Sequence, residues 1–275
     1  MKVQTTGPSI SLRFFNAFAA YSTRTSQPIR ISSLKAKALL AYLAMHAGEE
    51  IPRERLGKLL WPTALADGRQ NVRQCLLELQ HNLKPYCDDL FIVTRDTIAI
   101  RADAVSTDVR DFERYAKSGD VQNADILCTG EFLATCSPES EDYASWIASE
   151  RARLSALCCS VFRTLARVYD HNHRGAAAIR VAEKLVKFDP LREEWQRLLI
   201  ELYARYNGRA AALKYGKQVI SLIERELEAD AEPETLALMD AVRRGDFANR
   251  TTELPVSSPA PQGTIGSAPE LHPLG

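Results

Sequence analysis

The stretch from Asp67 to Lys84, DGRQNVRQCLLELQHNLK, decides how the rest of the chain is interpreted. At about 100° per residue, a helix over this stretch gathers four apolar residues into one stripe, with Cys75 at its margin. The stripe consists of Val72, Leu76, Leu79 and Leu83. An apolar stripe of this kind must pack against a core, so the helix has one face that belongs to the interior.

The opposite face of the same helix carries side chains that offer hydrogen bonds outward. These are Arg69, Gln70, Arg73, Gln74, Glu78 and His81, with Leu77 as the apolar exception. Arg and Gln are the side chains that pair bidentately with guanine and adenine edges in a major groove. An ordinary amphipathic surface helix shows the same pattern. The neighbouring elements therefore have to decide between the two interpretations.

The elements around this helix follow the order of a winged helix-turn-helix. We expect an antiparallel ribbon of 10–14 with 29–31, a helix over 34–44 that Ser32 or Ser33 caps, and a helix over 53–60. After the third helix, two β-rich runs at 90–93 and 98–100 predict a hairpin with Arg95 near its tip. In a winged helix the third helix enters the major groove and the hairpin touches the flanking backbone. The order of elements therefore favours the DNA-reading interpretation.

From about Asp108 onward the pattern becomes helical. We expect helices over 121–133, 143–171, 174–188, 191–206, 209–227 and 233–244. Part of this region repeats at 34 residues, since Leu165 maps to Leu199 and Tyr169 to Tyr203. Thirty-four residues is the tetratricopeptide period, in which paired helices stack in succession. The fold class predicted is mainly α, with an α+β winged helix-turn-helix followed by an all-α, tetratricopeptide-like domain.

The chain is long enough for two domains and its charge is unevenly distributed. Residues 1–101 hold 14 Lys and Arg against 8 Asp and Glu, although the 275-residue chain is neutral overall. A basic amino-terminal region suggests a polyanionic partner. The predicted division is a winged-helix domain at 8–102, an all-α domain at 106–246, and a disordered Pro-rich tail or linker at 247–275. If the last segment is a linker, a further domain would follow it.

Other classes of protein have little support in the sequence. The six cysteines form no C-x-x-C pair and no His lies at metal-ligand spacing, so we expect reduced thiols and no metal. There is no phosphate-binding glycine loop and no nucleophile–base signature, so we expect neither a cofactor nor an enzyme. The amino-terminal stretch lacks an uninterrupted apolar region, and no stretch approaches the roughly 20 apolar residues of a membrane span. We therefore expect a cytoplasmic protein without membrane contact.

Several short motifs, in order, resemble the SARP type of bacterial transcriptional activator. In this type a winged helix like that of response-regulator output domains precedes a bacterial transcriptional activation domain. The motifs span roughly residues 10–245 and include Lys35–Ala44, Arg53–Leu56, Leu59–Pro62, Val72–Leu76, Gly130–Leu133, Asp189–Glu194, Gly208–Leu213 and Glu232–Glu234. The chain departs from the family pattern at Leu77, Glu78, Gln80 and His81, where the family usually keeps basic residues. The resemblance implies binding of double-stranded DNA as a homodimer, and contact of the helical domain with RNA polymerase.

The predicted function is that of a sequence-specific DNA-binding regulator, an activator if the resemblance holds. The candidate base and phosphate contacts are Lys35, Lys37, Arg53, Arg69, Gln70, Arg73, Gln74 and Arg95. Two alternatives stay open. One is a protein-interaction scaffold whose winged helix has lost the ability to bind DNA, and the other is the regulatory amino-terminal half of a larger signalling protein.

Overall fold

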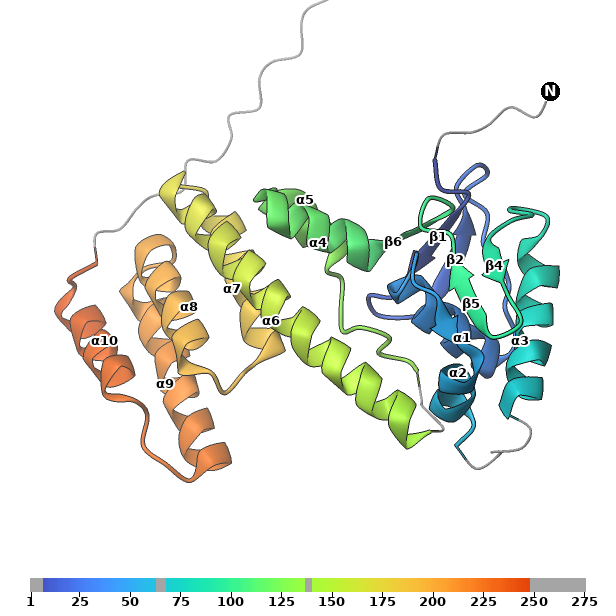
Figure 1. Ribbon diagram of the computed structural model, residues 1–275. Helices are drawn as coiled ribbons and strands as arrows, with labels where there is room; N and C mark the ends of the chain where they lie inside the picture. The colour runs from blue at the N-terminus through green and yellow to red at the C-terminus, as the bar shows by residue number, and fades with distance from the viewer. Residues whose placement is uncertain (1–6, 63–67, 137–139, 248–275) are drawn as a thin grey trace, which may run out of the picture.

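The computed structural model describes residues 7–62, 68–136 and 140–247. It contains an α+β amino-terminal part and a helical part, so the predicted fold class is confirmed (Figure 1). The amino-terminal part runs β1 Ile10–Arg13, β2 Ala19–Ser22, α1 Leu34–Met45, β3 Ile51–Pro52, α2 Arg53–Leu60, α3 Gly68–Leu83, β4 Phe91–Val93, β5 Thr97–Ile100 and β6 Val105–Thr107. The helical part runs α4 Asp108–Ser118, α5 Val121–Leu127, α6 Glu141–His171, α7 Gly175–Phe188, α8 Glu193–Tyr206, α9 Arg209–Leu227 and α10 Pro233–Arg244.

The three helices of the amino-terminal part begin and end close to where the sequence predicts them. The hydroxyl of Ser33 accepts a hydrogen bond from the Ala36 backbone N–H at 3.2 Å, so the predicted N-cap is confirmed. The residues Ala38–Ala44 of α1 are all buried, because this helix packs against α2, α3, β5 and β6. Helix α1 is thus the central element on which α3 rests.

The opening ribbon differs from the prediction. Strand β1 pairs antiparallel with Ala19–Ser22, not with 29–31, and Ile10 lies opposite Ser22. The chain reverses early, with Asn16 at a positive φ of 76°, a conformation that Asn tolerates better than most residues. The later segment reaches the sheet only through the isolated bridge between Tyr21 and Pro28.

Two further strands, neither of them predicted, complete the sheets. Strand β6 pairs parallel with β1, which gives the first sheet the order β2-β1-β6. The two-residue strand β3 pairs with β5, and β5 pairs with β4 in the predicted hairpin, so the second sheet has the order β3-β5-β4. The hairpin is therefore joined by hydrogen bonds to the segment that leads into α2.

Helices α2 and α3 cross at a contact between two glycines. A Cβ atom added to Gly57 would lie 3.2 Å from the backbone carbon of Gly68, and one added to Gly68 would lie 3.4 Å from Cα of Gly57. Glycine at both positions lets the two backbones approach this closely. The crossing sets the distance and the angle between α2 and α3.

The helical part is a succession of packed helices. Helix α6 contacts α5 and α7, and α7, α8 and α9 then pack in turn, with α10 against α8 and α9. Helix α7 begins at Gly175 and α9 at Arg209, which is the 34-residue spacing found in the sequence. The repeated tyrosines are both half-buried and Leu165 and Leu199 are both buried, as expected of equivalent positions.

Two expectations for the helical part need correction, and a third concerns residues that the structure does not describe. The helix predicted over 121–133 ends at Leu127, and a helix that was not predicted, α4, precedes it. Two of the thiols expected to be reduced, Cys128 and Cys158, form a disulfide, because the end of α5 packs against the middle of α6. All but the first residue of the predicted tail, from 248 onward, lies outside the described residues.

Candidate nucleic-acid interface

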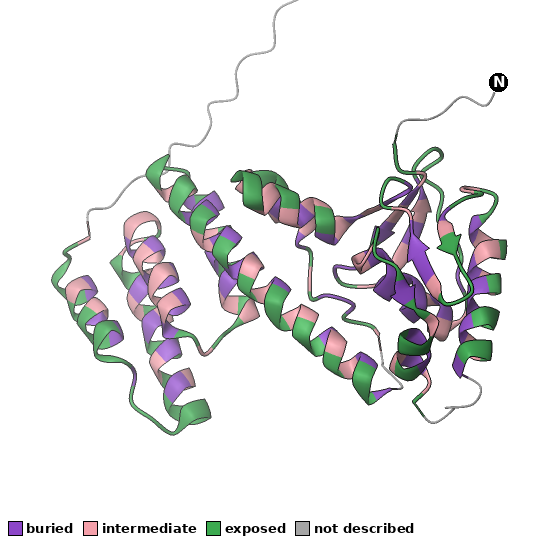
Figure 2. Cartoon of the chain, viewed as in Figure 1, coloured by how far each residue is buried: buried purple, intermediate pink, exposed green. Residues whose placement is uncertain are grey.

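Helix α3 divides into the two faces that the sequence indicates. Its buried residues are Gly68, Val72, Cys75, Leu76, Leu79 and Leu83, and they pack on α1 and α2. Arg69, Gln70, Arg73 and Gln74 are all exposed, and Leu77 is 52% exposed. Figure 2 shows this exposed face on the outside of the molecule, at the end away from α8–α10. The first half of α3 therefore presents four polar side chains to solvent.

The two arginines on this face differ in their surroundings. Arg69 lies 4.0 Å from the carboxylate of Glu54 on α2, and both side chains are more than half exposed. Glu54 also pairs with Lys58 at 2.9 Å, and that contact, more than Arg69, lowers the pKa of its carboxyl. Exposed pairs of this kind contribute little and break readily. Within the described ranges, Arg73 has neither a hydrogen-bond nor an ion-pair partner, so its guanidinium is available.

Glu78 lies in a different place from the one that the sequence suggested. Its carboxylate accepts a hydrogen bond from the backbone N–H of Ser33 at 3.4 Å, and the residue is half-buried. It therefore adds a negative charge beside the positive amino-terminal end of α1, where such a charge is favourable. The acidic residue in the second half of α3 has a structural role between α3 and α1 and is turned away from the polar face.

Arg53 and Arg95 lie at the hairpin. The backbone N–H of Arg53 donates to the carbonyl of Asp96 at 2.9 Å, and its guanidinium donates to the carbonyl of Thr94 at 3.1 Å. Arg53 thus ties the start of α2 to the hairpin turn. Arg95 is exposed in that turn and, in the described part of the chain, makes no hydrogen bond or ion pair. It is the free cation of the hairpin.

The two lysines of α1 are placed away from this face. The ammonium of Lys35 donates to the carbonyl of Leu60 at 2.6 Å and lies 5.6 Å from the ring centre of Trp61. A cation at the carboxyl end of a helix is favourable, so Lys35 stabilises the end of α2. Lys37 is half-buried and lines a small cavity between α1 and the start of α6, together with Ser140 and Tyr143. The structure therefore does not bring these lysines together with Arg69, Arg73 and Arg95.

Sequence reasoning missed the glycines that position α3, and it missed the structural role of Arg53, which it assigned to a phosphate contact. Gly57 and Gly68 set its crossing with α2, and Arg53 fixes the hairpin beside α2. Gly57 lies inside the predicted helix 53–60, where glycine destabilises a helix by about 1 kcal/mol relative to alanine. A glycine at such a position indicates a close packing contact, and this signal was available in the sequence. Nothing in the local sequence pointed to the partner of Arg53.

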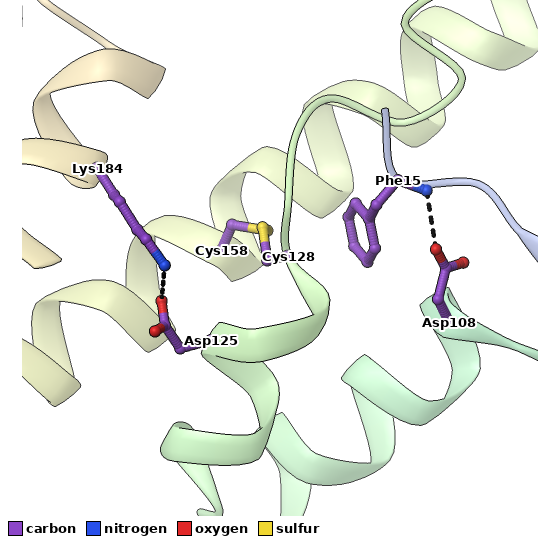
Figure 3. Close-up of a disulfide and its surroundings, with 6 residues drawn as sticks. All are labelled: Phe15, Asp108, Asp125, Cys128, Cys158 and Lys184. Carbon is purple, nitrogen blue, oxygen red and sulfur yellow. Dashed lines mark hydrogen bonds and ion pairs between the residues drawn. A yellow bond between two sulfur atoms is a disulfide. The ribbon is translucent and has the colours of Figure 1, made fainter. Parts of the chain in front are cut away.

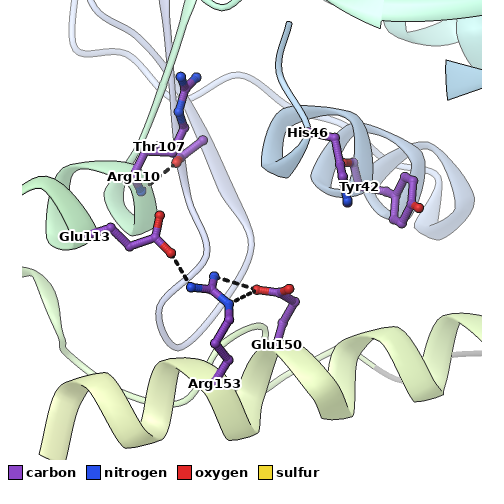
Figure 4. A network of polar contacts seen from close by, with 7 residues as sticks. All are labelled: Tyr42, His46, Thr107, Arg110, Glu113, Glu150 and Arg153. Atoms are coloured by element: carbon purple, nitrogen blue, oxygen red, sulfur yellow. Dashed lines mark hydrogen bonds and ion pairs between the residues drawn. The ribbon is translucent and has the colours of Figure 1, made fainter. Parts of the chain in front are cut away.

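Aromatic side chains join the far side of α1 to the helical part. The ring centres of Tyr42 on α1 and Trp146 on α6 lie 5.0 Å apart, and Trp146 also contacts Phe132 and Tyr143. The hydroxyl of Ser140 donates to the carbonyl of Leu59 at 2.6 Å. Nearby, Arg153 on α6 forms ion pairs with Glu150 of the same helix and with Glu113 of α4 (Figure 4). The helix that supports α3 is thus packed directly against α6.

Comparison with known proteins identifies the helical part. Residues 107–243 match the family model of the bacterial transcriptional activator domain. The helical part of the chain is therefore a bacterial transcriptional activator domain. The resemblance to SARP-type regulators, in which this domain follows a winged helix, is thereby confirmed. No curated protein matches the chain.

A solved structure shares the fold of this activator-domain chain. It is Mycobacterium tuberculosis EmbR in complex with a low-affinity phosphopeptide, with a TM-score of 0.64 and 16% sequence identity. The match covers 86% of the present chain and 65% of the EmbR chain. Among the described residues, no helix is long and apolar enough to cross a membrane.

Proposed function

We propose that this activator-domain protein is a sequence-specific DNA-binding transcriptional regulator, with α3 in the major groove and the β4–β5 hairpin on the flanking backbone. The observation that carries the proposal is the exposed face formed by Arg69, Gln70, Arg73 and Gln74. Apart from the weak contact of Arg69 with Glu54, these side chains have no partners within the described ranges, so their hydrogen-bonding groups are free to meet base edges.

The roles of the individual residues follow from their placement. Arg73, Gln70 and Gln74 are proposed to read bases, while Arg69 and Arg95 contact phosphates. Arg53 contributes mainly by holding the hairpin in place. Lys35 and Lys37, proposed as phosphate contacts from the sequence, have no such role in this account, because the ammonium of Lys35 donates to the carbonyl of Leu60 and Lys37 lines the cavity between α1 and α6.

The helical domain is proposed to serve self-association and contact with the transcription machinery. In this proposal residues 8–102 form the DNA-binding domain and residues 106–246 the activator domain. The regulator acts in the cytoplasm as a dimer and activates by contact with RNA polymerase. Support for this part comes from the match of residues 107–243 to the bacterial transcriptional activator domain.

Selection of bound sequences from random duplexes, followed by an Arg73→Ala variant, tests the proposal. If Arg73 is bidentate to a guanine, the variant loses about 1–3 kcal/mol of binding free energy and accepts other bases at one position. Arg73→Lys keeps the charge but not the planar pair of donors, so it is also expected to accept other bases at that position. A uniform loss on all sequences would identify Arg73 as a phosphate contact. Enrichment of no sequence at all would favour the alternative of an interaction scaffold.

A further inference from the structure

A cleft of about 970 Å³ lies where α5, the loop after it, α6 and the end of α7 meet the segment after β1. Sites for small molecules commonly measure roughly 300–1,000 Å³. The cleft is remote from the exposed face of α3, and the DNA contacts proposed above do not use it. Its lining is uneven, with aromatic residues at the bottom and cations at the edge.

The floor of the cleft is apolar. Phe188 of α7 is half-buried and Ile126 of α5 is 68% exposed, so these apolar side chains offer accessible surface, whereas Phe132 and Phe162 behind them are 1% and 0% exposed. The Cys128–Cys158 disulfide forms part of the same wall. Figure 3 shows this disulfide between Lys184 on one side and the ring of Phe15 on the other. Such a floor suits a hydrocarbon or aromatic body.

The edge of the cleft carries three cations and two carboxylates. The ammonium of Lys184 pairs with Asp125 at 2.6 Å, and Arg151 lies 3.6 Å from Glu131 while donating to the carbonyls of Phe132 and Leu133. Lys187 is exposed and has no ion-pair partner among the described residues. Two cations are therefore neutralised within the protein, and one positive charge at the edge is left over.

From this arrangement we infer that the cleft binds a small amphipathic organic monoanion, such as a medium-chain carboxylate. The apolar body lies against Phe188 and Ile126, and the anionic head meets Lys187. One uncompensated cation favours a single negative charge over a cation, which it would repel, and leaves the second charge of a dianion without a partner at the edge.

The occupied cleft would lie next to the junction with the amino-terminal part. Phe132 forms a β-bridge with Phe15, the backbone N–H of Asn16 donates to the carbonyl of Glu131 at 2.8 Å, and that of Leu133 donates to Phe14 at 2.7 Å. Because Phe15 lines the cleft, a ligand in it lies next to the segment that follows β1. Binding in the cleft nevertheless does not depend on the proposed DNA-binding function.

Isothermal titration of the full chain with decanoate, decan-1-ol and decylamine tests the inference. We expect decanoate to bind most tightly and decylamine least, since the three share one tail and differ in the charge of the head. Lys187→Gln is expected to weaken decanoate binding roughly two- to fivefold, the size of one partly exposed charge pair, and Lys187→Arg to restore it. Lys217→Gln, at an exposed position of α9, is the matched control and should leave binding unchanged.

A second pair of variants tests the place of binding. Ala152 is exposed and lines the cleft, so Ala152→Trp is expected to weaken decanoate binding more than about tenfold by filling the space. Ala156→Trp lies one turn along the same exposed side of α6 but outside the cleft lining, and should bind like the wild type. Equal affinities for the three amphiphiles, no binding of decanoate, or wild-type binding by Ala152→Trp would each overturn the inference.

Discussion

Asp108 joins the two parts of the chain through its carboxylate. It begins α4 and accepts hydrogen bonds from the backbone N–H of Phe14 at 2.9 and 3.0 Å. It also accepts a hydrogen bond from the backbone N–H of Phe15 at 3.0 Å (Figure 3). Burial raises the pKa of this carboxyl from 3.8 to about 6, against the opposing effect of the hydrogen bonds it accepts. Desolvation of the charged form is therefore the larger influence.

This pKa predicts how stability depends on pH. Between about pH 4 and pH 6 the native protein holds a proton on Asp108 that the unfolded chain has released. The free energy of unfolding should consequently fall as the pH rises through this interval, and this contribution should be constant above about pH 6. Asp108→Asn removes this contribution. The difference in free energy of unfolding between the variant and the wild type should therefore change between pH 4 and pH 6. Urea unfolding at several pH values measures it, and a pH-independent difference would contradict the assignment.

The disulfide between Cys128 and Cys158 makes a separate prediction about stability. It closes a loop with a sequence separation of 30 residues, and bonds of this kind typically contribute about 2–4 kcal/mol by restricting the unfolded chain. Urea unfolding in the presence of a dithiol reductant should therefore give a lower free energy of unfolding for the wild type. Cys158→Ser should show no effect of the reductant, whereas Cys159→Ser, at a buried free cysteine beside it, should respond like the wild type. An unchanged wild-type value on reduction would show that the bond does not contribute.

Single residues also show where sequence reasoning stops. The helical wheel placed Val72, Leu76, Leu79 and Leu83 correctly in the core, because their partners need only be apolar. It could not place Glu78, which accepts a hydrogen bond from Ser33 at a separation of 45 residues. A polar contact with one specific distant atom leaves no periodic signal.

At the scale of elements, the position of α3 depends on its crossing with α2. The two helices meet at Gly57 and Gly68 with no side chain between them. Any side chain at this point would separate the helices and move the exposed face of α3 relative to the hairpin that Arg53 holds. The crossing therefore fixes the geometry on which the proposed reading of a major groove depends.

Gly57→Leu is expected to lower the free energy of unfolding by about 1–3 kcal/mol, the usual cost of overpacking a close contact. It should also weaken specific DNA binding more than nonspecific binding, since α3 would be displaced while its charge is unchanged. Urea unfolding and binding to selected and random duplexes measure the two effects. Ala237→Leu, at an exposed position of α10, is the control and should leave both quantities unchanged. Wild-type stability of Gly57→Leu would contradict the close crossing.

Elements differed in how well the sequence predicted them. Helices such as α2 and α10 begin and end at the predicted residues, because apolar periodicity and proline at the start are local signals. Strands β3 and β6 were missed, since each has only two or three residues and pairs with a strand far along the chain. Helix α5 was predicted too long because the segment after it is apolar, yet that segment packs as a loop against Phe14 and Phe15.

For the whole molecule, the long helix α6 links the DNA-binding candidate to the activator domain. Its amino-terminal turns contact α2 and α1 through Ser140, Tyr143 and Trp146, and its carboxyl-terminal half packs on α7 (Figure 1). Lys35 and Lys37 were predicted as phosphate contacts from position alone, and in the structure they lie at the packing of α1 against α2 and α6. The sequence places them at the start of a helix, but only the packing of the two parts shows that this end faces α6.

The salt dependence of binding to a selected duplex tests the central claim, that the α3 face and the hairpin contact DNA. Each phosphate contact contributes roughly −0.9 to the slope of log affinity against log salt. Replacing Arg69, Arg73 and Arg95 together by alanine should make the slope shallower by about 1.8 per bound chain, because Arg69 and Arg95 each neutralise one phosphate in this account and Arg73 reads a base. Replacing Arg167 and Arg180, two exposed arginines of the helical part, by alanine should leave it unchanged. A wild-type slope near zero, or an unchanged slope in the triple variant, would contradict the account.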